Sequence, residues 1–388
     1  MKRVIIECGA AQTCAALLVD DIVWKFWFGP ARGDEPADQF PHAGRLFAGR
    51  IKRVDRSLNA AFVDVGGARD GFLPLKKGNQ ADCIEGALIK VEIKSPPRQA
   101  KGAALRFVAS LEIGEPGRLP PFRDVVIEAA EAIGADADEI LVDDGAALRV
   151  LQPAGFERVR HESRPVALFE HYGAAHELDA AHERIVPLAG GGQLIIDEAQ
   201  ALTAIDVDTG GLSALSPARL REKIAFAAAS EATRQISMRD IGGHVVIDFP
   251  DIPGDAGRKR FQEYLRKVMA RLDGVSATSF SRSGLYSFTA PHHALSLLDR
   301  ITEVKPVAPV AGRFVTVEAA AKSSLANLER NLRSSPKSRF LLTVGDEVEA
   351  CFSQHPQWRQ RLTHRYGARF EIVADDKFGD RSFDLSEQ

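Results

Sequence analysis

The segment from residue 193 to residue 249 constrains the fold most. Its first part, "QLIIDEAQALTAIDVD", predicts two strands around a short turn, because apolar and polar residues alternate on both sides. Ser216 and Pro217 predict the N-cap and first turn of a helix that runs to about Arg239. "HVVIDF" then predicts another strand. A strand, a helix and a strand of these lengths form a right-handed crossover, so the two flanking strands should run parallel in an α/β sheet.

Three aspartates stand at the carboxyl ends of these two parallel strands. Asp206 and Asp208 end the first strand, where side chains two residues apart share a face, and Asp248 ends the second. Open parallel sheets bind ligands at this edge, and carboxylate oxygens are ligands that Mg²⁺ or Mn²⁺ prefers. The pattern therefore indicates phosphoryl chemistry. Aspartate also ends strands for structural reasons, and spacing alone leaves that alternative open.

The segment from Arg45 to Arg106 is basic. It carries 13 Lys and Arg against 6 Asp and Glu, and 13 − 6 gives +7 in a chain whose formal net charge is −3. Its pattern of about five short strands in roughly 65 residues suits a small closed barrel of OB type. A basic barrel is typical of a module that contacts phosphates, although a merely solvated basic surface is the alternative.

The remaining composition excludes several classes of protein. No apolar run approaches the roughly 18 residues that a bilayer crossing needs, and the N-terminus lacks the apolar core of a signal peptide. We therefore expect a cytoplasmic protein without a membrane partner. The four cysteines contain no C-x-x-C pair, so neither a disulfide framework nor a cysteine zinc site is predicted.

Elsewhere the patterning predicts further helices and strands. "KRVIIECG" and "AALLVDDIVWKFWF" are interpreted as two strands joined by a turn. "FRDVVIEAAEAIG" predicts a helix and "EILVDD" a strand. "VKPVAPVAG" is interpreted as a linker before a small C-terminal α/β unit.

Several separate blocks resemble the ribonuclease E/G family of endoribonucleases. "ALTAIDVDTG", "RDIGGHVVIDFPDI" and "SRSGL" occur in the order and at the spacing of that family, and "GRIKRVDRSLNAAFVDVGGARDGFLPL" resembles its RNA-binding barrel of the ribosomal-protein S1 type. The resemblance implies an α/β multidomain fold: a ribonuclease H-like part with an inserted S1-type OB β-barrel, a DNase I-like α/β catalytic part and a small C-terminal α/β domain. The implied boundaries are, in that order, 1–44 with 118–175, 45–117, 176–303 and 304–388.

The resemblance also implies an activity. A magnesium-dependent endoribonuclease of this family cleaves single-stranded RNA internally, and a metal-activated water leaves a 5′-phosphate on the downstream product. The catalytic and metal-binding positions fall on Asp206 and Asp248, with Asp208 as a candidate for a third metal ligand. Mn²⁺ could replace Mg²⁺, and no zinc is expected.

Four further residues fall on RNA-binding positions of the resembled family. Phe62 and Phe72 match aromatic positions of the barrel that pack on bases, and Lys101 matches a basic position near the cleavage site. Arg282, in "SRSGL", could contact the RNA backbone or pair with a carboxylate. Rings stack on bases while cations meet phosphates, which suits single-stranded RNA. Without the resemblance, each phenylalanine could equally belong to the barrel core.

The sequence departs from the family at several points. Asp208 stands where Asn is usual, and Gln200 stands where Glu is usual, which would soften the orientation of the metal-binding carboxylates. Most of the domain that reads a 5′-monophosphate is missing, so cleavage should not depend on a 5′-monophosphate end. The C-P-x-C zinc block is also missing, and His292 and His293 have no nearby cysteine. A zinc-clipped tetramer is therefore not expected, whereas a homodimer is left open.

Two alternatives to the endoribonuclease remain from the sequence. The chain could be an RNA-binding protein of the same fold with little or no cleavage activity, but a pure binder would not need to keep Asp206 and Asp248. A metal phosphohydrolase for small phosphoesters would not need the basic barrel. The endoribonuclease is therefore the leading hypothesis.

Overall fold

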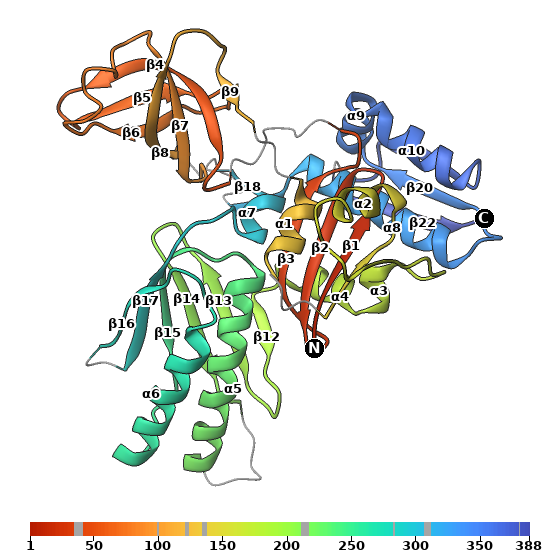
Figure 1. Ribbon diagram of the computed structural model, residues 1–388. Coiled ribbons are helices and arrows are strands. Elements are labelled where there is room, and N and C mark those ends of the chain that lie inside the picture. Colours follow the sequence, from red (N-terminus) through yellow and green to blue (C-terminus); the bar gives the residue numbers. More distant parts are fainter. Residues whose placement is uncertain are drawn as a thin grey trace. The chain divides into compact units, whose positions relative to one another are not determined.

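The computed structural model describes most of the chain, namely residues 1–34, 42–98, 101–120, 124–133, 138–210, 217–281, 284–305, 312–379 and 381–388. It is a mixed α/β protein with several sheets, which confirms the predicted fold class at that level (Figure 1). The chain divides into two compact units: Met1–Ala37, Pro121–Ala180 and Leu298–Gln388 form the first, and Asp38–Pro120 with Ala181–Leu297 the second. Within the described ranges, none of the helices has the length and apolar character that spanning a membrane would require.

A five-stranded sheet forms the centre of the first unit, in the order β11-β10-β1-β2-β3. Its strands are β1 (Lys2–Cys8), β2 (Gln12–Val19), β3 (Ile22–Pro30), β10 (Glu139–Val142) and β11 (Val159–His161). β1, β2 and β3 are antiparallel neighbours, whereas β10 runs parallel to β1 and β11 runs parallel to β10. Helices α1 (Val125–Glu131) and α2 (Gly145–Leu151) contribute apolar side chains to its core.

The prediction of a single strand for residues 15–28 was wrong. Asp20 and Asp21 have φ angles of 51° and 61°, and this left-handed pair makes a two-residue turn between β2 and β3. Aspartate tolerates the left-handed region better than most residues, so the apolar run folds back on itself as a hairpin.

The C-terminal part of the first unit is a three-stranded sheet with helices. Its elements are α7 (Leu297–Ile301), β18 (Thr302–Lys305), β19 (Gly312–Val315), α8 (Val317–Ser334), β20 (Phe340–Val344), α9 (Asp346–Gln354), α10 (Pro356–Tyr366), β21 (Phe370–Ala374) and β22 (Phe383–Glu387). β20 lies between β21 and β22. The linker predicted for residues 304–312 is wrong at both ends, because Val304 and Lys305 of β18 pair with Arg313 and Gly312 of β19.

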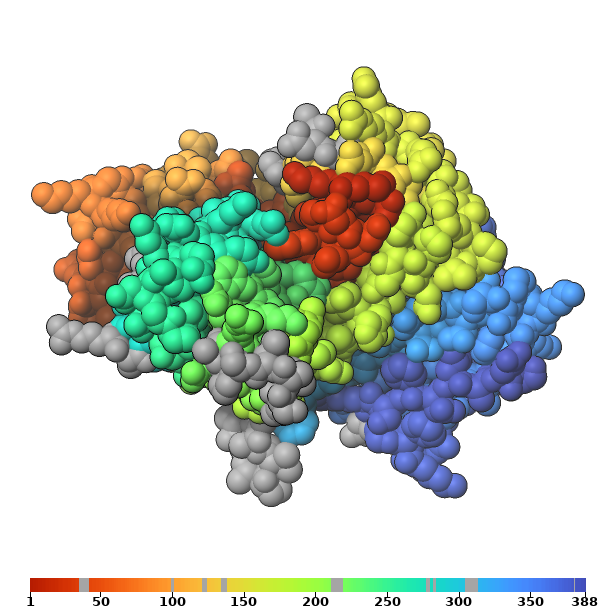
Figure 2. Space-filling view, turned by 90° about the horizontal axis from the view of Figure 1, so that it is seen from below, coloured from red at the N-terminus to blue at the C-terminus, as the bar shows by residue number. Residues whose placement is uncertain are grey.

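Segments far apart in the sequence share the cores of this unit. The loop residues Ala10 and Ala11, after β1, are buried in one cluster with apolar side chains of α8, α9 and α10. Val4 of β1 shares another cluster with Val142 of β10. Figure 2 shows the early residues in red and the residues near 150–180 in yellow-green forming one continuous surface. Two short helices, α3 (Leu168–His171) and α4 (Ala174–Ala180), belong to that yellow-green segment.

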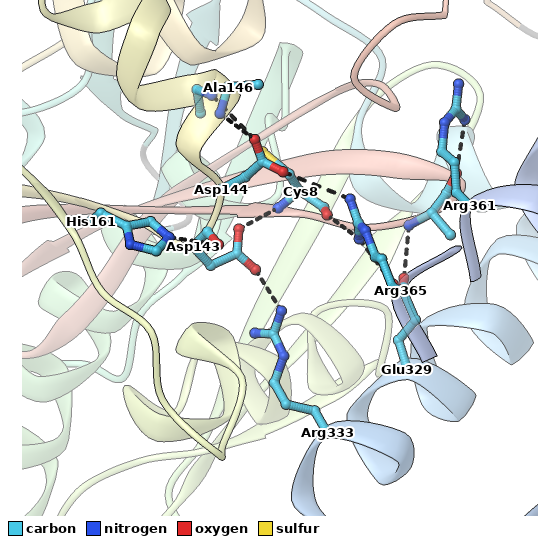
Figure 3. A network of polar contacts seen from close by, with 11 residues as sticks. Cys8, Asp143, Asp144, Ala146, His161, Glu329, Arg333, Arg361 and Arg365 are labelled. Carbon is cyan, nitrogen blue, oxygen red and sulfur yellow. Dashed lines mark hydrogen bonds and ion pairs between the residues drawn. The ribbon is translucent and has the colours of Figure 1, made fainter. Parts of the chain in front are cut away.

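A buried polar network ties the C-terminal helices to the end of β1 (Figure 3). The carboxylate of Asp143 accepts hydrogen bonds from the backbone N–H of Cys8, at 2.8 Å, and from the guanidinium of Arg333 on α8, at 2.9 Å. The carboxylate of Glu329, also on α8, accepts from the N–H of Ala10 at 2.7 Å and from Arg365 at 3.1 Å. The network therefore satisfies backbone groups that the end of β1 would otherwise bury without partners.

The second unit contains a six-stranded sheet in the order β12-β13-β14-β15-β17-β16. Its strands are β12 (Ile185–Pro187), β13 (Gln193–Glu198), β14 (Thr203–Asp208), β15 (Gly243–Asp248), β16 (Ser276–Phe280) and β17 (Leu285–Ala290). β14 and β15 are parallel and are joined through α5 (Pro217–Met238), which confirms the predicted crossover. α5 and α6 (Asp255–Met269) lie side by side along the sheet (Figure 1) and bury its inner face.

The basic segment of the second unit folds as a closed barrel. Its strands are β4 (Leu46–Asp55), β5 (Ala60–Asp64), β6 (Gly71–Pro74), β7 (Leu88–Ser95) and β8 (Ala104–Leu111), with the short β9 (Gly117–Arg118) on β4. Because β5 pairs with both β6 and β4, the order β4-β5-β6-β8-β7 returns to β4 and closes the ring. The five short strands predicted from the sequence are therefore present, and their inward side chains form one apolar core.

Candidate functional site

The outer face of the six-stranded sheet carries the predicted carboxylates. Along β14, Thr203, Ile205 and Val207 are buried, whereas Asp206 and Asp208 are exposed on the opposite face. Asp206 is the register partner of Asp248 on the neighbouring parallel strand, and Asp248 is exposed as well. Adjacent strands lie about 4.8 Å apart, so these two carboxylates project side by side from one face.

The local sequence explains why this pair is held in place. Buried residues alternate with the aspartates, so burying Ile205 and Ile247 against the helices forces Asp206 and Asp248 outward. Phe249, which follows Asp248 directly, is buried and packs edge-on against a phenylalanine of α6, with ring centroids 5.0 Å apart. The apolar anchors therefore fix the carboxylates on two rigid elements.

The donor set fits a divalent cation. Among the residues that the structure describes, neither Asp206 nor Asp248 has a hydrogen-bond or ion-pair partner. Two like charges on register neighbours repel each other, and a cation between them would remove that repulsion. The described ranges hold no group of three or more His, Cys, Asp and Glu side chains arranged for a metal. Two carboxylates with the remaining positions open match the way proteins usually hold Mg²⁺, which keeps several waters.

Asp208 is engaged differently from the other two aspartates. One of its carboxylate oxygens accepts a hydrogen bond from the Gln193 amide at 3.1 Å, and the other accepts from the Gly210 N–H at 3.0 Å. Its register partner is Gln193 on β13, whereas the pairing of β14 with β15 ends at Asp206. Asp208 therefore contacts the β13 side and the following turn rather than the partner strand that carries Asp248.

Gln200 lies in a turn that is distant from the carboxylate pair. It is exposed in the turn between β13 and β14, and β14 begins only at Thr203. Asp206 lies a further three residues along the strand, or about 10 Å. The turn is at the opposite end of the strand from Asp206, and the softened orientation expected from Gln200 stays a prediction.

The two barrel phenylalanines lie on the outside of the barrel. Phe62 on β5 and Phe72 on β6 are register partners, with ring centroids 6.0 Å apart and planes at 77°. Phe72 is 37% exposed, and neither ring belongs to the apolar core, which takes their neighbours Val63 and Leu73 instead. The barrel-core alternative for these residues is therefore wrong.

The two basic candidates have different outcomes. Lys101 is exposed, and its backbone pairs with that of Arg98 through hydrogen bonds of 2.8 and 3.0 Å. The next residue, Gly102, passes so close to β6 that a Cβ added there would lie 1.9 Å from the Asp70 carbonyl oxygen. Lys101 is thereby held beside the strand of Phe72. Arg282 lies outside the described residues.

Comparison with known proteins relates part of the chain to one family. Residues 119–290 match the sequence model described as the Ribonuclease E/G family. Over that segment, the chain is similar to the ribonuclease E/G family. The family resemblance seen in the sequence is therefore confirmed, and the segment includes both strands that carry Asp206 and Asp248.

Individual relatives extend the similarity beyond that segment. Ribonuclease E of Escherichia coli is 26% identical over an alignment that covers 85% of this chain and 40% of the relative. Ribonuclease G of Escherichia coli is 26% identical, with 65% of this chain and 53% of the relative covered. A chloroplastic ribonuclease E/G-like protein of Arabidopsis thaliana is 28% identical, with 65% and 27% covered. The chain thus spans about half the length of these relatives, or less.

Sequence reasoning missed one residue beside the barrel aromatics. The guanidinium carbon of Arg53, on β4, lies 4.4 Å from the centroid of the Phe62 ring. Arg50 pairs with Asp64 and Ile51 with Val63, so an unbroken register would place Lys52 opposite Phe62. The β4–β5 register instead shifts between Ile51 and Arg53. This bulge brings Arg53 over the ring, and a one-residue bulge leaves no reliable signal in a sequence.

Proposed function

We propose that this chain is a metal-dependent endoribonuclease that cleaves single-stranded RNA internally. The observation that carries the proposal is the register pairing of Asp206 with Asp248 on the exposed face of a parallel crossover. The relatives named Ribonuclease E and Ribonuclease G support the same reaction. The finer domain assignment is part of the proposal: the closed barrel is of the S1 and OB type, the six-stranded sheet is DNase I-like, the five-stranded sheet is ribonuclease H-like, and residues 304–388 form a small domain.

In this proposal Asp206 and Asp248 hold Mg²⁺, and Mn²⁺ could take its place. When bound, the metal activates a water and offsets charge on the phosphate, so that the downstream product carries a 5′-phosphate. The two strands keep both carboxylates on one rigid face. Asp208, through its hydrogen bonds to Gln193 and Gly210, shapes the turn beyond the site.

The barrel supplies RNA binding in this proposal. Phe72 offers an exposed ring to a base, and Lys101 offers a cation to a phosphate. Arg282 remains a candidate for a backbone contact. Because stacking tolerates any base, recognition should favour unpaired RNA over a particular sequence.

The decisive test compares matched variants on an unstructured, end-labelled RNA. Wild type with Mg²⁺ should produce internal cuts, and Asp206→Asn and Asp248→Asn should abolish them. Asp197→Asn is the control, because Asp197 is an exposed carboxylate on the neighbouring strand β13 that pairs with Arg184 at 2.6 Å. It should leave cleavage intact. Tight binding without Mg²⁺-dependent cutting by the wild type would instead establish the RNA-binding alternative.

A second test concerns the 5′ end of the substrate. RNAs that differ only in a 5′-monophosphate or a 5′-triphosphate should be cut at the same rate, because the sequence lacks the resembled family's 5′-sensing phosphate contact. A strong preference for the monophosphate would contradict this part of the proposal.

A further inference from the structure

Three side chains form a strip across the outside of the barrel. Arg53, Phe62 and Phe72 lie on β4, β5 and β6, and each is the register partner of the next. Because neighbouring strands are about 4.8 Å apart, the strip extends over roughly 10 Å. We call these three residues the outer strip.

The contacts within the outer strip decide which surfaces a ligand can meet. Arg53 lies over the Phe62 ring at 4.4 Å and so covers one of its faces. Phe62 meets Phe72 at 77° in an edge-to-face contact, and Phe72 is 37% exposed. The planar surfaces available to a ligand are therefore the guanidinium of Arg53 and the ring of Phe72.

The charge of Arg53 is less neutralised than that of the adjacent Lys52. Arg53 is 61% exposed, and its ion pair with Asp55 measures 3.7 Å. Lys52, displaced by the bulge, lies between Asp64 at 3.2 Å and Asp70 at 3.0 Å. Hydrogen bonds from Ser57 and Leu58 further occupy Asp55. Arg53 is thus better able than Lys52 to meet an anion.

The other end of the outer strip also carries a cation. The N–H of Phe72 donates to the Ala103 carbonyl at 2.7 Å, which draws the loop with Lys101 against β6. The strip thus runs from Arg53, which is both a cation and a planar surface, to Phe72, whose strand is held beside Lys101. This order suits a single strand whose bases stack across the strip while its phosphates meet the cations.

We propose that Arg53 is an RNA-binding residue whose guanidinium plane, supported from below by Phe62, stacks on a base of single-stranded RNA. The inference rests on the proposed function and changes one part of it. Phe62 acts mainly as the support of Arg53, and the base at this position meets the guanidinium. Arginine planes stack on unpaired bases in the same way as aromatic rings.

The test measures binding without cleavage, using a fluorescein-labelled oligoadenylate of about 10 nucleotides, the site size of one OB barrel, in EDTA. By fluorescence anisotropy, Arg53→Ala should weaken binding about 10-fold and flatten the dependence of log affinity on log salt by about 0.7. Arg53→Lys should keep the salt slope but remain weakened, because an ammonium has no plane. Arg106→Ala is the control: Arg106 is equally exposed on the barrel and is paired with Glu92. It should bind as the wild type does.

The outcomes separate this inference from the proposed function. If Arg53→Ala binds as tightly as the wild type, or if Arg53→Lys restores full affinity, the stacking role is overturned while the endoribonuclease proposal stands. If the wild type does not bind the oligonucleotide, both are overturned. If binding depends on Arg53 but Mg²⁺ produces no cuts, this inference holds and the cleavage proposal fails.

Discussion

Replacing Arg333 with Met should destabilise the first unit by about 3 kcal/mol. The Asp143 carboxylate is only 4% exposed and accepts two hydrogen bonds, from Arg333 at 2.9 Å and from the Cys8 N–H at 2.8 Å. Removing one partner of a buried ion pair costs about 3–5 kcal/mol. Arg333 itself is 23% exposed, so water can partly replace it, and the lower end of that range applies.

The first unit has its own spectroscopic probe. All three tryptophans of the chain, Trp24, Trp27 and Trp358, belong to this unit. Urea unfolding followed by tryptophan fluorescence therefore reports the first unit, whatever the second unit does. The Arg333→Met variant should show a lower unfolding midpoint at unchanged slope.

Two further variants test whether the buried ion pair is the source of the loss. Arg160 is 65% exposed and pairs with Glu139, which also pairs with Arg3. Arg160→Met leaves the pair with Arg3 in place, so it should lower the free energy of unfolding by less than about 1 kcal/mol. Combining Arg333→Met with Asp143→Asn should recover part of the loss, because the neutral amide needs no counter-charge. If Arg333→Met costs no more than Arg160→Met, the buried pair of Arg333 and Asp143 does not stabilise the unit.

Three other substitutions probe separate features. Burial and the neighbouring Asp143 raise the pKa of Glu7 to about 7 from 4.5, so the wild type loses stability as pH rises through that window. Above pH 7, Glu7→Gln should therefore unfold at a higher urea concentration than the wild type. The expected gain in the free energy of unfolding is about 3 kcal/mol, at about 1.4 kcal/mol per pKa unit. Gly102→Ala should push the Lys101 loop off Asp70 and lower both the melting temperature and the affinity for the oligoadenylate. Thr316→Ala removes the hydroxyl that caps α8 at 3.2 Å and should cost about 1 kcal/mol in the same urea titration.

The carboxylate pair could be predicted from the sequence because it depends on two robust signals. The alternation around Asp206 assigns each side chain to a face, and a helix of more than twenty residues between two strands requires a parallel crossover. Register within such a sheet follows from burying Ile205 and Ile247 together. Local periodicity and the rule for parallel crossovers were therefore sufficient to predict the carboxylate pair.

The features that could not be predicted depend on single residues or distant pairings. The bulge in β4 exchanges Lys52 for Arg53 opposite Phe62, and one extra residue moves every later side chain to the other face. The hydrogen bond of Asp208 depends on where Gln193 falls on β13, which the residues near Asp208 do not encode. Such positions require the paired strand as well as the local sequence.

The order in which the segments of the first unit occur in the chain has a consequence for its synthesis. β1 emerges before the second unit, yet the carboxylate of Glu329 and the guanidinium of Arg365, which bind the backbone of residues 8–10, emerge more than three hundred residues after β1. Both segments of the second unit, Asp38–Pro120 and Ala181–Leu297, are already complete by then. Domains generally fold as units as the chain is made. The barrel and the carboxylate sheet can therefore form on the ribosome before α8 and α10 are available to contact the end of β1.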